Sequence, residues 1–246
     1  MDAHERIVFS LDGFTDVWEA VEALNALGPL AKGGIVKIKG LFDRHGTDAL
    51  VPFLHHGYRP FVDFKVHDTP DAAAERAVIW RGAGAEFFTV HASGRDEMVR
   101  KCVEAGGMTM KIIAVTVLTS FDRTDAMHVF GASVSKMVGN LAWGASCAGA
   151  HGIVASPRDM SAIDELKKYN RFSLPVFTPA VRPLWAAKND QSRIATPAEA
   201  IKAGADYLII GRPIFKPPTE IGGPKEAFAR IVEEIKSAHA QPQGPS

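Results

Sequence analysis

The chain has 246 residues, which is long for an average domain but ordinary for a single α/β barrel. Its 28 Lys and Arg residues balance 28 Asp and Glu residues, so no global field favours nucleic acid or an anionic membrane. Hydrophobic residues make up 46% of the sequence, yet no stretch approaches the roughly 20 apolar residues of a membrane span. These features predict a soluble protein that captures any anionic ligand with a local cluster of charges.

The cysteines and the N-terminus bear on the cellular compartment. Cys102 and Cys147 form neither a C-x-x-C motif nor a disulfide framework, which is typical of a reducing cytosol. The first residues lack the apolar region of a signal peptide. We therefore expect a cytoplasmic protein.

Short apolar runs, often β-branched, alternate with segments of helical character along the chain. The eight runs span residues 7–11, 34–38, 60–65, 86–91, 111–118, 152–155, 174–178 and 206–210. This is the rhythm of parallel strands joined by crossover helices, and eight such units predict a (β/α)8 TIM barrel. An open doubly wound sheet is the alternative, but no Gly-x-Gly-x-x-Gly follows the first run.

Helix-start signals follow several of these runs. Thr69-Pro70, Ser156-Pro157 and Thr196-Pro197 each place a capping hydroxyl before a proline at the first helical position. Thr196 with Glu199 also fits a capping box. We expect one catalytic barrel domain over residues 1–239, followed by a disordered tail, 240–246, that is rich in Pro, Gln and Gly.

The segment 63–68 carries two carboxylates and an amine at the end of an apolar run. Side chains alternate along a strand, so Asp63 and Lys65 should point the same way, with Asp68 just beyond the strand end. Lys37, in the preceding run, offers a second amine. Such a cluster suits an enzyme that repels one anionic group and hands a proton to another. The structural alternative is a buried ion-pair network that only orders the barrel interior.

Other polar residues also follow the predicted strands. In (β/α)8 enzymes the C-terminal face of the barrel holds the active site, so side chains far apart in sequence converge there. The candidates are Asp12 after the first run, Lys37 in the second, Asp63 and Lys65 in the third, Thr119 and Ser120 near the fifth, and Gly211 and Arg212 after the eighth. His91, which ends the fourth run, is more simply a structural histidine.

The segment after the eighth run is typical of an anion site. Gly211 exposes backbone N–H groups at a helix start, and Arg212 adds a charged fork. The loop 179–192 supplies Arg182 and Gln191, either of which could close over the same phosphate. The alternative for Arg182 is a plain surface arginine.

Several motifs occur together in a specific order. They are Leu11-Asp12, Lys37, the segment 63–68 with Pro70, the segments 89–94, 115–120, 178–183 and 190–193, and Gly211-Arg212-Pro213. In this order they resemble the orotidine 5′-phosphate decarboxylase family over roughly residues 6–238. Sister families that share the Asp-x-Lys-x-x-Asp core lack the Leu-Thr-Ser and Asp-Gln-x-Arg elements in this order.

The resemblance implies a TIM barrel that converts orotidine 5′-monophosphate to uridine 5′-monophosphate, the last step of pyrimidine synthesis, with neither cofactor nor metal. By position, Lys37, Asp63, Lys65 and Asp68 are similar to the family's charged tetrad. The resemblance places Asp63 against the substrate carboxylate, makes Lys65 the proton donor to C6, and assigns Lys37 and Asp12 to the ribose hydroxyls. It also implies a homodimer in which Asp68 reaches the neighbouring site.

The resemblance also implies which residues contact the phosphate and the pyrimidine ring of the substrate. Arg182, Gln191 and Arg212, with Gly211, are similar to the family's phosphate grip. Thr119 or Ser120 is similar to the contact with the pyrimidine ring.

Three positions depart from the family pattern. Lys37-Ile38-Lys39-Gly40 replaces the usual Lys-Val-Gly, and because Lys37 and Lys39 share a face of an extended strand, either could enter the site. Ala72 stands where the family has a threonine that helps to hold the ribose, which would reduce affinity. Ala180 stands where the family has glycine, a change that would stiffen the entry to the loop.

Two other functions compete with decarboxylation of the nucleotide. One is a metal-dependent phosphosugar decarboxylase or epimerase on the same barrel, with His67, His91, Asp63 and Asp68 as ligands. Against it, the Lys65 ammonium would oppose a divalent cation. The other is a nucleotide-binding paralogue without catalysis, although a retained charge tetrad argues against it because unused buried charges are costly.

Overall fold

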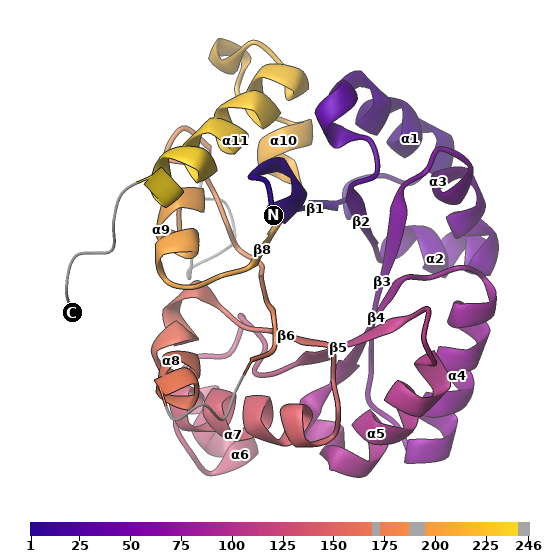
Figure 1. Cartoon of the computed structure of the whole chain (residues 1–246), viewed down its shortest axis with the longest axis vertical. Helices are drawn as coiled ribbons and strands as arrows, with labels where there is room; N and C mark the ends of the chain where they lie inside the picture. Colours follow the sequence, from indigo (N-terminus) through magenta and orange to yellow (C-terminus); the bar gives the residue numbers. More distant parts are fainter. Residues whose placement is uncertain (169–172, 187–194, 241–246) are drawn as a thin grey trace.

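The structure, a computed structural model, describes residues 1–168, 173–186 and 195–240. Its centre is a closed parallel barrel in which each strand pairs with its sequence neighbours and β1 pairs with β8 (Figure 1). The strands are β1 Ile7–Ser10, β2 Ile35–Ile38, β3 Arg59–Val66, β4 Phe87–His91, β5 Lys111–Val115, β6 Gly152–Val154, β7 Val176–Thr178 and β8 Tyr207–Ile210. The predicted TIM barrel is confirmed, and each apolar run of the sequence corresponds to one strand, although β3 extends one residue beyond its run at each end.

Helices surround the barrel as an outer ring (Figure 1). They are α1 Val17–Ala26, α2 Gly40–His45, α3 Val51–His55, α4 Pro70–Gly82, α5 Arg95–Gly106, α6 Arg123–Phe130, α7 Val134–Cys147, α8 Met160–Lys168, α9 Pro197–Lys202, α10 Arg212–Phe215 and α11 Pro224–Ala240. The longer interval after the fifth apolar run holds two helices, α6 and α7. Helix α11 includes Ala240, the first residue of the expected tail, and residues 241–246 lie outside the described part of the chain.

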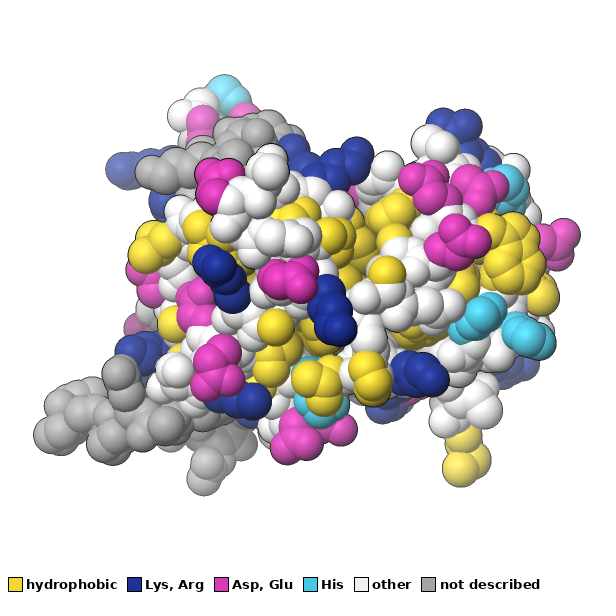
Figure 2. Space-filling model, turned by 90° about the horizontal axis from the view of Figure 1, so that it is seen from above, with side chains coloured by type: hydrophobic (Ala, Val, Ile, Leu, Met, Phe, Trp, Pro, Cys, Tyr) yellow, Lys and Arg dark blue, Asp and Glu magenta, His cyan; other side chains and the backbone are white. Residues whose placement is uncertain are grey.

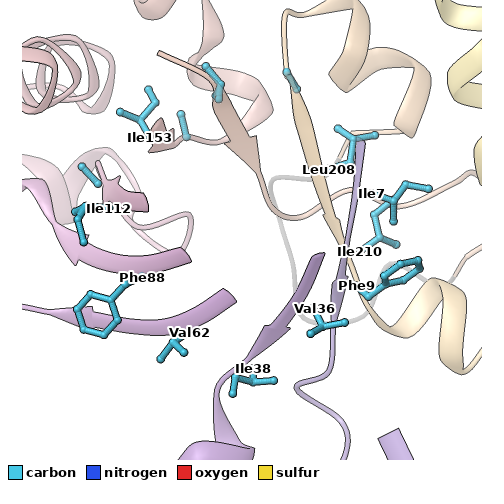
Figure 3. Close-up of a cluster of buried hydrophobic side chains, with 14 of the residues drawn as sticks. Ile7, Phe9, Val36, Ile38, Val62, Phe88, Ile112, Ile153, Leu208 and Ile210 are labelled. Carbon is cyan, nitrogen blue, oxygen red and sulfur yellow. The ribbon is translucent and has the colours of Figure 1, made fainter. Parts of the chain in front are cut away.

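Alternation along the strands builds two apolar layers. Side chains that point into the barrel form an inner cluster of Val8, Ile35, Phe61, Phe87, Ile113, Phe177 and Ile209. Their sequence neighbours point outward and pack beneath the helices, as Figure 3 shows for Ile7, Phe9, Val36, Ile38, Val62, Phe88, Ile112, Ile153, Leu208 and Ile210. Because both faces of each strand are covered, the strands read as continuous apolar runs.

The predicted helix starts have different outcomes. At α9 the capping box is formed, because the Thr196 hydroxyl accepts the Glu199 N–H and the Glu199 carboxylate accepts the Thr196 N–H. Ser156 caps only the short 3-10 helix Pro157–Asp159. At α4 the Thr69 side chain makes no capping hydrogen bond, and the predicted cap is wrong; the Thr69 N–H instead donates to Asp68 Oδ1 over 2.8 Å.

Strand β3 is irregular where it reaches the mouth of the barrel. Val62 pairs with Phe88 and Val66 pairs with Val90, so three residues of β3 face the single residue Thr89 of β4. Lys65, within this bulge, has a φ of 53°, which is rare for a residue other than glycine. The simple alternation expected for this segment is therefore interrupted.

The outer surface mixes charges of both signs. On the face drawn in Figure 2, Lys and Arg side chains are interspersed with Asp and Glu side chains, in keeping with the equal numbers in the sequence. Among the described residues, no helix is both long enough and apolar enough to cross a bilayer.

Candidate active site

A cavity of about 450 Å³ opens at the C-terminal ends of the strands. Its apolar wall comes from the inner layer, through Phe61 and Ile209, and from Val115 and Val154 at the ends of β5 and β6. The polar residues that line it and were predicted from the sequence are Asp12, Lys37, Asp63, Lys65, Thr119, Arg182, Gly211 and Arg212. Apolar and charged side chains from many of the strand ends thus meet in one cavity.

Four charged side chains form a continuous ion-pair chain on one side of the cavity. Lys37 Nζ donates to Asp12 Oδ1 at 2.7 Å and to Asp12 Oδ2 at 2.9 Å. The same ammonium donates to Asp63 Oδ2 over 3.2 Å, and Lys65 Nζ lies 2.6 Å from that oxygen. Because Lys37 and Asp63 are almost fully buried, water screens these interactions weakly.

The structure shows which of Lys37 and Lys39 enters the cavity, a question that the sequence left open. Lys37, in the middle of β2, is 5% exposed and points into the cavity. Lys39 follows the end of β2, where the backbone leaves the extended conformation with a ψ of −80°, and its side chain is exposed. Lys37 is therefore the lysine of the ion-pair chain, because the strand ends before a second inward position is reached.

Mutual attraction sets the pKa values of the buried pair. Burial opposes the charge on Lys37, but Asp63 and Asp12 outweigh it and raise the Lys37 pKa above its ordinary 10.5. Burial alone would raise the pKa of Asp63, yet Lys37 and Lys65 overcome this and hold it below its ordinary 3.8. Both groups are therefore ionised at neutral pH.

Lys65 behaves differently from Lys37. Burial lowers the Lys65 pKa, Asp63 opposes that change, and the positive charges of Lys37 and Lys39 add to the lowering. The net result is a pKa below the ordinary 10.5. Of the two amines that contact Asp63, Lys65 is the one that releases its proton more readily.

Thr89 is a residue of this site that the sequence analysis did not single out. It is fully buried on β4, and its hydroxyl donates to Asp63 Oδ1 at 3.1 Å. The Thr89 hydroxyl oxygen in turn accepts the backbone N–H of Lys65 at 2.8 Å. Thr89 belongs to one of the motifs quoted above, but no sequence signal shows that its side chain spans a bulge in the neighbouring strand.

Two arginines, from the segments after β7 and β8, also line the cavity. Arg182 follows β7, is 6% exposed, and has its backbone N–H bonded to the carbonyl of Ala195 at 2.8 Å. Arg212 starts α10 directly after Gly211. A Cβ atom at residue 211 would lie 2.7 Å from the carbonyl oxygen of Ser10, so glycine allows the end of β8 to approach β1. The two guanidinium groups supply the positive charge that an anionic group needs.

Three predicted site residues are not part of the described cavity. Asp68 is exposed after β3, and its carboxylate lies 3.7 Å from the Arg76 guanidinium instead of joining the ion-pair chain. Ser120 is exposed beside Thr119 and does not line the cavity. Gln191 lies outside the described residues.

Ala180 explains why a glycine is suited to the segment after β7. Its φ is 63°, in the left-handed region that glycine adopts without steric cost, and its side chain is buried against the cavity. The alanine therefore holds a strained backbone at the entry to the loop.

In the part of the chain that the structure describes, the acidic and histidine side chains do not assemble into a metal site. Within residues 1–168, 173–186 and 195–240, no three His, Cys, Asp or Glu side chains are grouped to hold an ion. Asp63, which the metal-dependent alternative requires, already accepts bonds from Lys37, Thr89 and Lys65. His67 and His91 contact each other edge to face, with ring centroids 5.6 Å apart.

Comparison with known proteins agrees with these observations. The model of the orotidine 5′-phosphate decarboxylase / HUMPS family matches residues 5–227. An orotidine 5′-phosphate decarboxylase of Geobacter metallireducens is 40% identical over 244 residues, covering 95% of this chain and 97% of the relative. That of Heliobacterium modesticaldum is 36% identical, covering 98% of this chain and all of the relative.

Solved structures give the same result. The crystal structure of orotidine 5′-phosphate decarboxylase from Lactobacillus acidophilus superposes with a TM-score of 0.75 at 27% identity, covering 94% of this chain and 99% of the other. The chain belongs to the orotidine 5′-phosphate decarboxylase / HUMPS family.

Proposed function

We propose that the protein decarboxylates orotidine 5′-monophosphate to uridine 5′-monophosphate in pyrimidine synthesis, without a cofactor. One observation carries the proposal: Asp63 sits between two ammonium groups in a cavity that two arginines also line. The first set of charges suits a reacting carboxylate and carbon, and the second suits a phosphate. Relatives that carry the name of this activity cover the chain almost completely.

Lys65 is the proton donor in this proposal. When the bond between C6 and the carboxyl carbon breaks, the electron pair stays on C6 and carbon dioxide leaves. The pair then takes a proton from Lys65 Nζ, which becomes neutral and regains a proton from solvent. The position of Lys65 beside Asp63 and its lowered pKa support this role.

Charge stabilisation supplies the main catalytic effect. An sp2 carbanion at C6 is poorly delocalised by the ring, so a fixed ammonium beside it stabilises the transition state more than the ground state. Asp63 faces the substrate carboxylate and keeps the Lys65 ammonium in place. The cluster is formed before substrate arrives, so little reorganisation is needed during the reaction.

The remaining predicted site residues are assigned to the parts of the substrate that do not react. Lys37 and Asp12 bind the ribose hydroxyls, and Thr119 or Ser120 contacts the pyrimidine ring. The phosphate is held by Arg182, Gln191, Gly211 and Arg212. Binding energy from the phosphate contributes to the reaction at C6, because it orders the site and excludes water around the charges.

The active assembly in this proposal is a cytoplasmic homodimer. Asp68 is separated from the ion-pair chain within its own subunit and is partly exposed beside Arg76. A partner subunit would bring its Asp68 carboxylate to the cavity and complete the charged tetrad. This assignment gives a function to a carboxylate that its own cavity does not use.

The experiment is a spectrophotometric assay of the purified protein with orotidine 5′-monophosphate in the presence of a chelator. We expect the absorbance of the substrate to fall to that of uridine 5′-monophosphate, and expect orotidine, which lacks the phosphate, to be a far poorer substrate. No turnover despite binding of uridine 5′-monophosphate would contradict the proposal in favour of a binding protein. Activity that the chelator abolishes would favour a metal-dependent enzyme.

A further inference from the structure

The bulge in β3 leaves Lys65 without a regular partner in the sheet. Between the pairs Val62–Phe88 and Val66–Val90, β3 contributes three residues and β4 contributes only Thr89. The backbone N–H of Lys65 donates to the Thr89 hydroxyl instead of to a β4 carbonyl. This side-chain hydroxyl thus closes a gap in the backbone hydrogen bonding of a buried sheet.

The backbone of Lys65 is strained at the same point. Its φ of 53° lies in the left-handed region, a conformation that is unfavourable for a residue other than glycine and persists only when surrounding contacts hold it. The hydrogen bond from Lys65 N–H to Thr89, at 2.8 Å, is such a contact. The conformation directs the Lys65 ammonium onto Asp63 Oδ2.

Thr89 also fixes the other member of the pair. Its hydroxyl proton is directed to Asp63 Oδ1, which leaves Oδ2 facing both lysines. One hydroxyl therefore accepts from Lys65 and donates to Asp63, and it does so from a fully buried position. Valine has the same shape but neither function, whereas serine has both.

We propose that Thr89 is a positioning residue for decarboxylation, holding the Lys65 ammonium and the Asp63 carboxylate in their reactive arrangement. It does not touch the substrate; it acts through the two side chains that do. The inference rests on the proposed roles of Asp63 and Lys65. It adds that the relative positions of the Lys65 ammonium and the Asp63 carboxylate depend on a hydroxyl from the neighbouring strand.

The test compares Thr89→Val with Thr89→Ser in the full-length protein. We expect Thr89→Val to lower kcat by about a hundredfold with KM changed by less than about threefold, because misplaced reacting groups affect the chemical step. Thr89→Ser should recover most of kcat. Equal losses in both variants, or a rise in KM at unchanged kcat, would overturn the proposal.

Thr116→Val is the matched control. Thr116 is 2% exposed, and its hydroxyl donates to the carbonyl of Val154 at 2.7 Å without contact to Asp63 or Lys65. Its replacement should lower the thermal unfolding temperature but leave kcat within about threefold of the wild type. A kcat loss as large as that of Thr89→Val would show that any lost buried hydroxyl has this effect.

A crystal structure of Thr89→Val separates this inference from the proposed reaction. We expect Lys65 to leave its left-handed conformation and its Nζ to move away from Asp63 Oδ2, whether or not the wild type decarboxylates the nucleotide. An unchanged Lys65 backbone and Lys65–Asp63 contact in the variant would overturn the positioning role. Absence of turnover in the wild type would instead count against the proposed function.

Discussion

Asp63 is the residue on which the charges of the cavity converge. Its Oδ2 atom contacts the ammonium groups of Lys37 and Lys65, and its Oδ1 atom accepts the Thr89 hydroxyl. The two ammonium groups favour the ionised carboxylate, which is why the pKa of Asp63 is lowered although burial acts in the opposite direction. A carboxylate held in this way stays charged when a substrate carboxylate is placed beside it.

The lowered pKa of Asp63 makes part of the stability depend on acid pH. Because the folded pKa lies below the ordinary 3.8, the stabilisation is fully present above pH 3.8 and is lost as pH falls through the folded value. The difference in unfolding free energy between the wild type and Asp63→Asn should therefore shrink as pH is lowered below 3.8. Denaturant unfolding of both proteins at a series of pH values below 3.8 measures this difference. A difference that does not change with pH would contradict the lowered pKa of Asp63.

Lys37 and Lys39 offer a direct comparison of a buried and an exposed lysine. Lys37→Ala removes the link between Asp12 and Asp63, and we expect kcat/KM to fall by about a hundredfold or more. Lys39→Ala should change kcat/KM by less than about tenfold, because its exposed side chain acts on the cavity only through a screened charge. Steady-state kinetics on both variants measures the two values of kcat/KM. A larger loss for Lys39→Ala than for Lys37→Ala would show that Lys39 is the lysine that acts in the site.

At the scale of the elements, strands β3 and β4 determine the geometry of the site. The strand runs were visible in the sequence because buried parallel strands are continuously apolar. The bulge in β3 could not be predicted from the sequence, because it depends on how Val62 and Val66 pair with β4. The same limit applies to Thr89, whose neighbours Val90 and Phe88 suggest only a buried strand, and to Thr69, whose expected cap the structure does not contain.

Strand β7 contains a buried hydroxyl that makes no hydrogen bond to any described residue. Thr178 is fully buried, lies on the same outward side as Val176, and its Oγ1 has no hydrogen-bond partner among the described residues. Thr178→Val keeps the shape and removes the cost of burying this group, so the unfolding free energy should rise by about 1 kcal/mol.

Thermal unfolding of Thr178→Val and the wild type is the measurement. A gain of about 1 kcal/mol corresponds to roughly 2–4 °C for a chain of this length. Thr116→Val serves as the opposite case, because its hydroxyl is bonded and its loss should destabilise. A decrease in stability for Thr178→Val would show that the hydroxyl has a partner after all.

At the scale of the whole molecule, closure of the barrel brings the residues of the site together. Asp12 and Arg212 are 200 positions apart in the sequence, yet both line one cavity because β1 pairs with β8. The sequence predicted this convergence, since strand ends of a TIM barrel share one face. The relation of Asp68 to the site depends on a second subunit, and one chain carries no direct signal of its interface.

Subunit complementation tests whether Asp68 acts in the neighbouring site. Lys65→Ala and Asp68→Ala should each be inactive alone. If Asp68 crosses the interface, a mixed dimer contains one site with both wild-type residues, so remixing equal amounts should recover up to about a quarter of the wild-type activity. The variants are mixed after reversible dissociation and assayed, with unmixed samples as controls. No recovery in dimers shown to be mixed would place Asp68 outside the partner's site.

The most direct test of the account is the activity of Lys65→Ala on orotidine 5′-monophosphate. We predict that kcat falls by about 10²–10⁴-fold or more, because the variant lacks both the proton donor and the charge beside C6. Calorimetry should show that the variant still binds uridine 5′-monophosphate within about tenfold of the wild type, because the arginines that hold the phosphate remain. A variant that binds the nucleotide and decarboxylates at the wild-type rate would contradict the role of Lys65 and, with it, the mechanism.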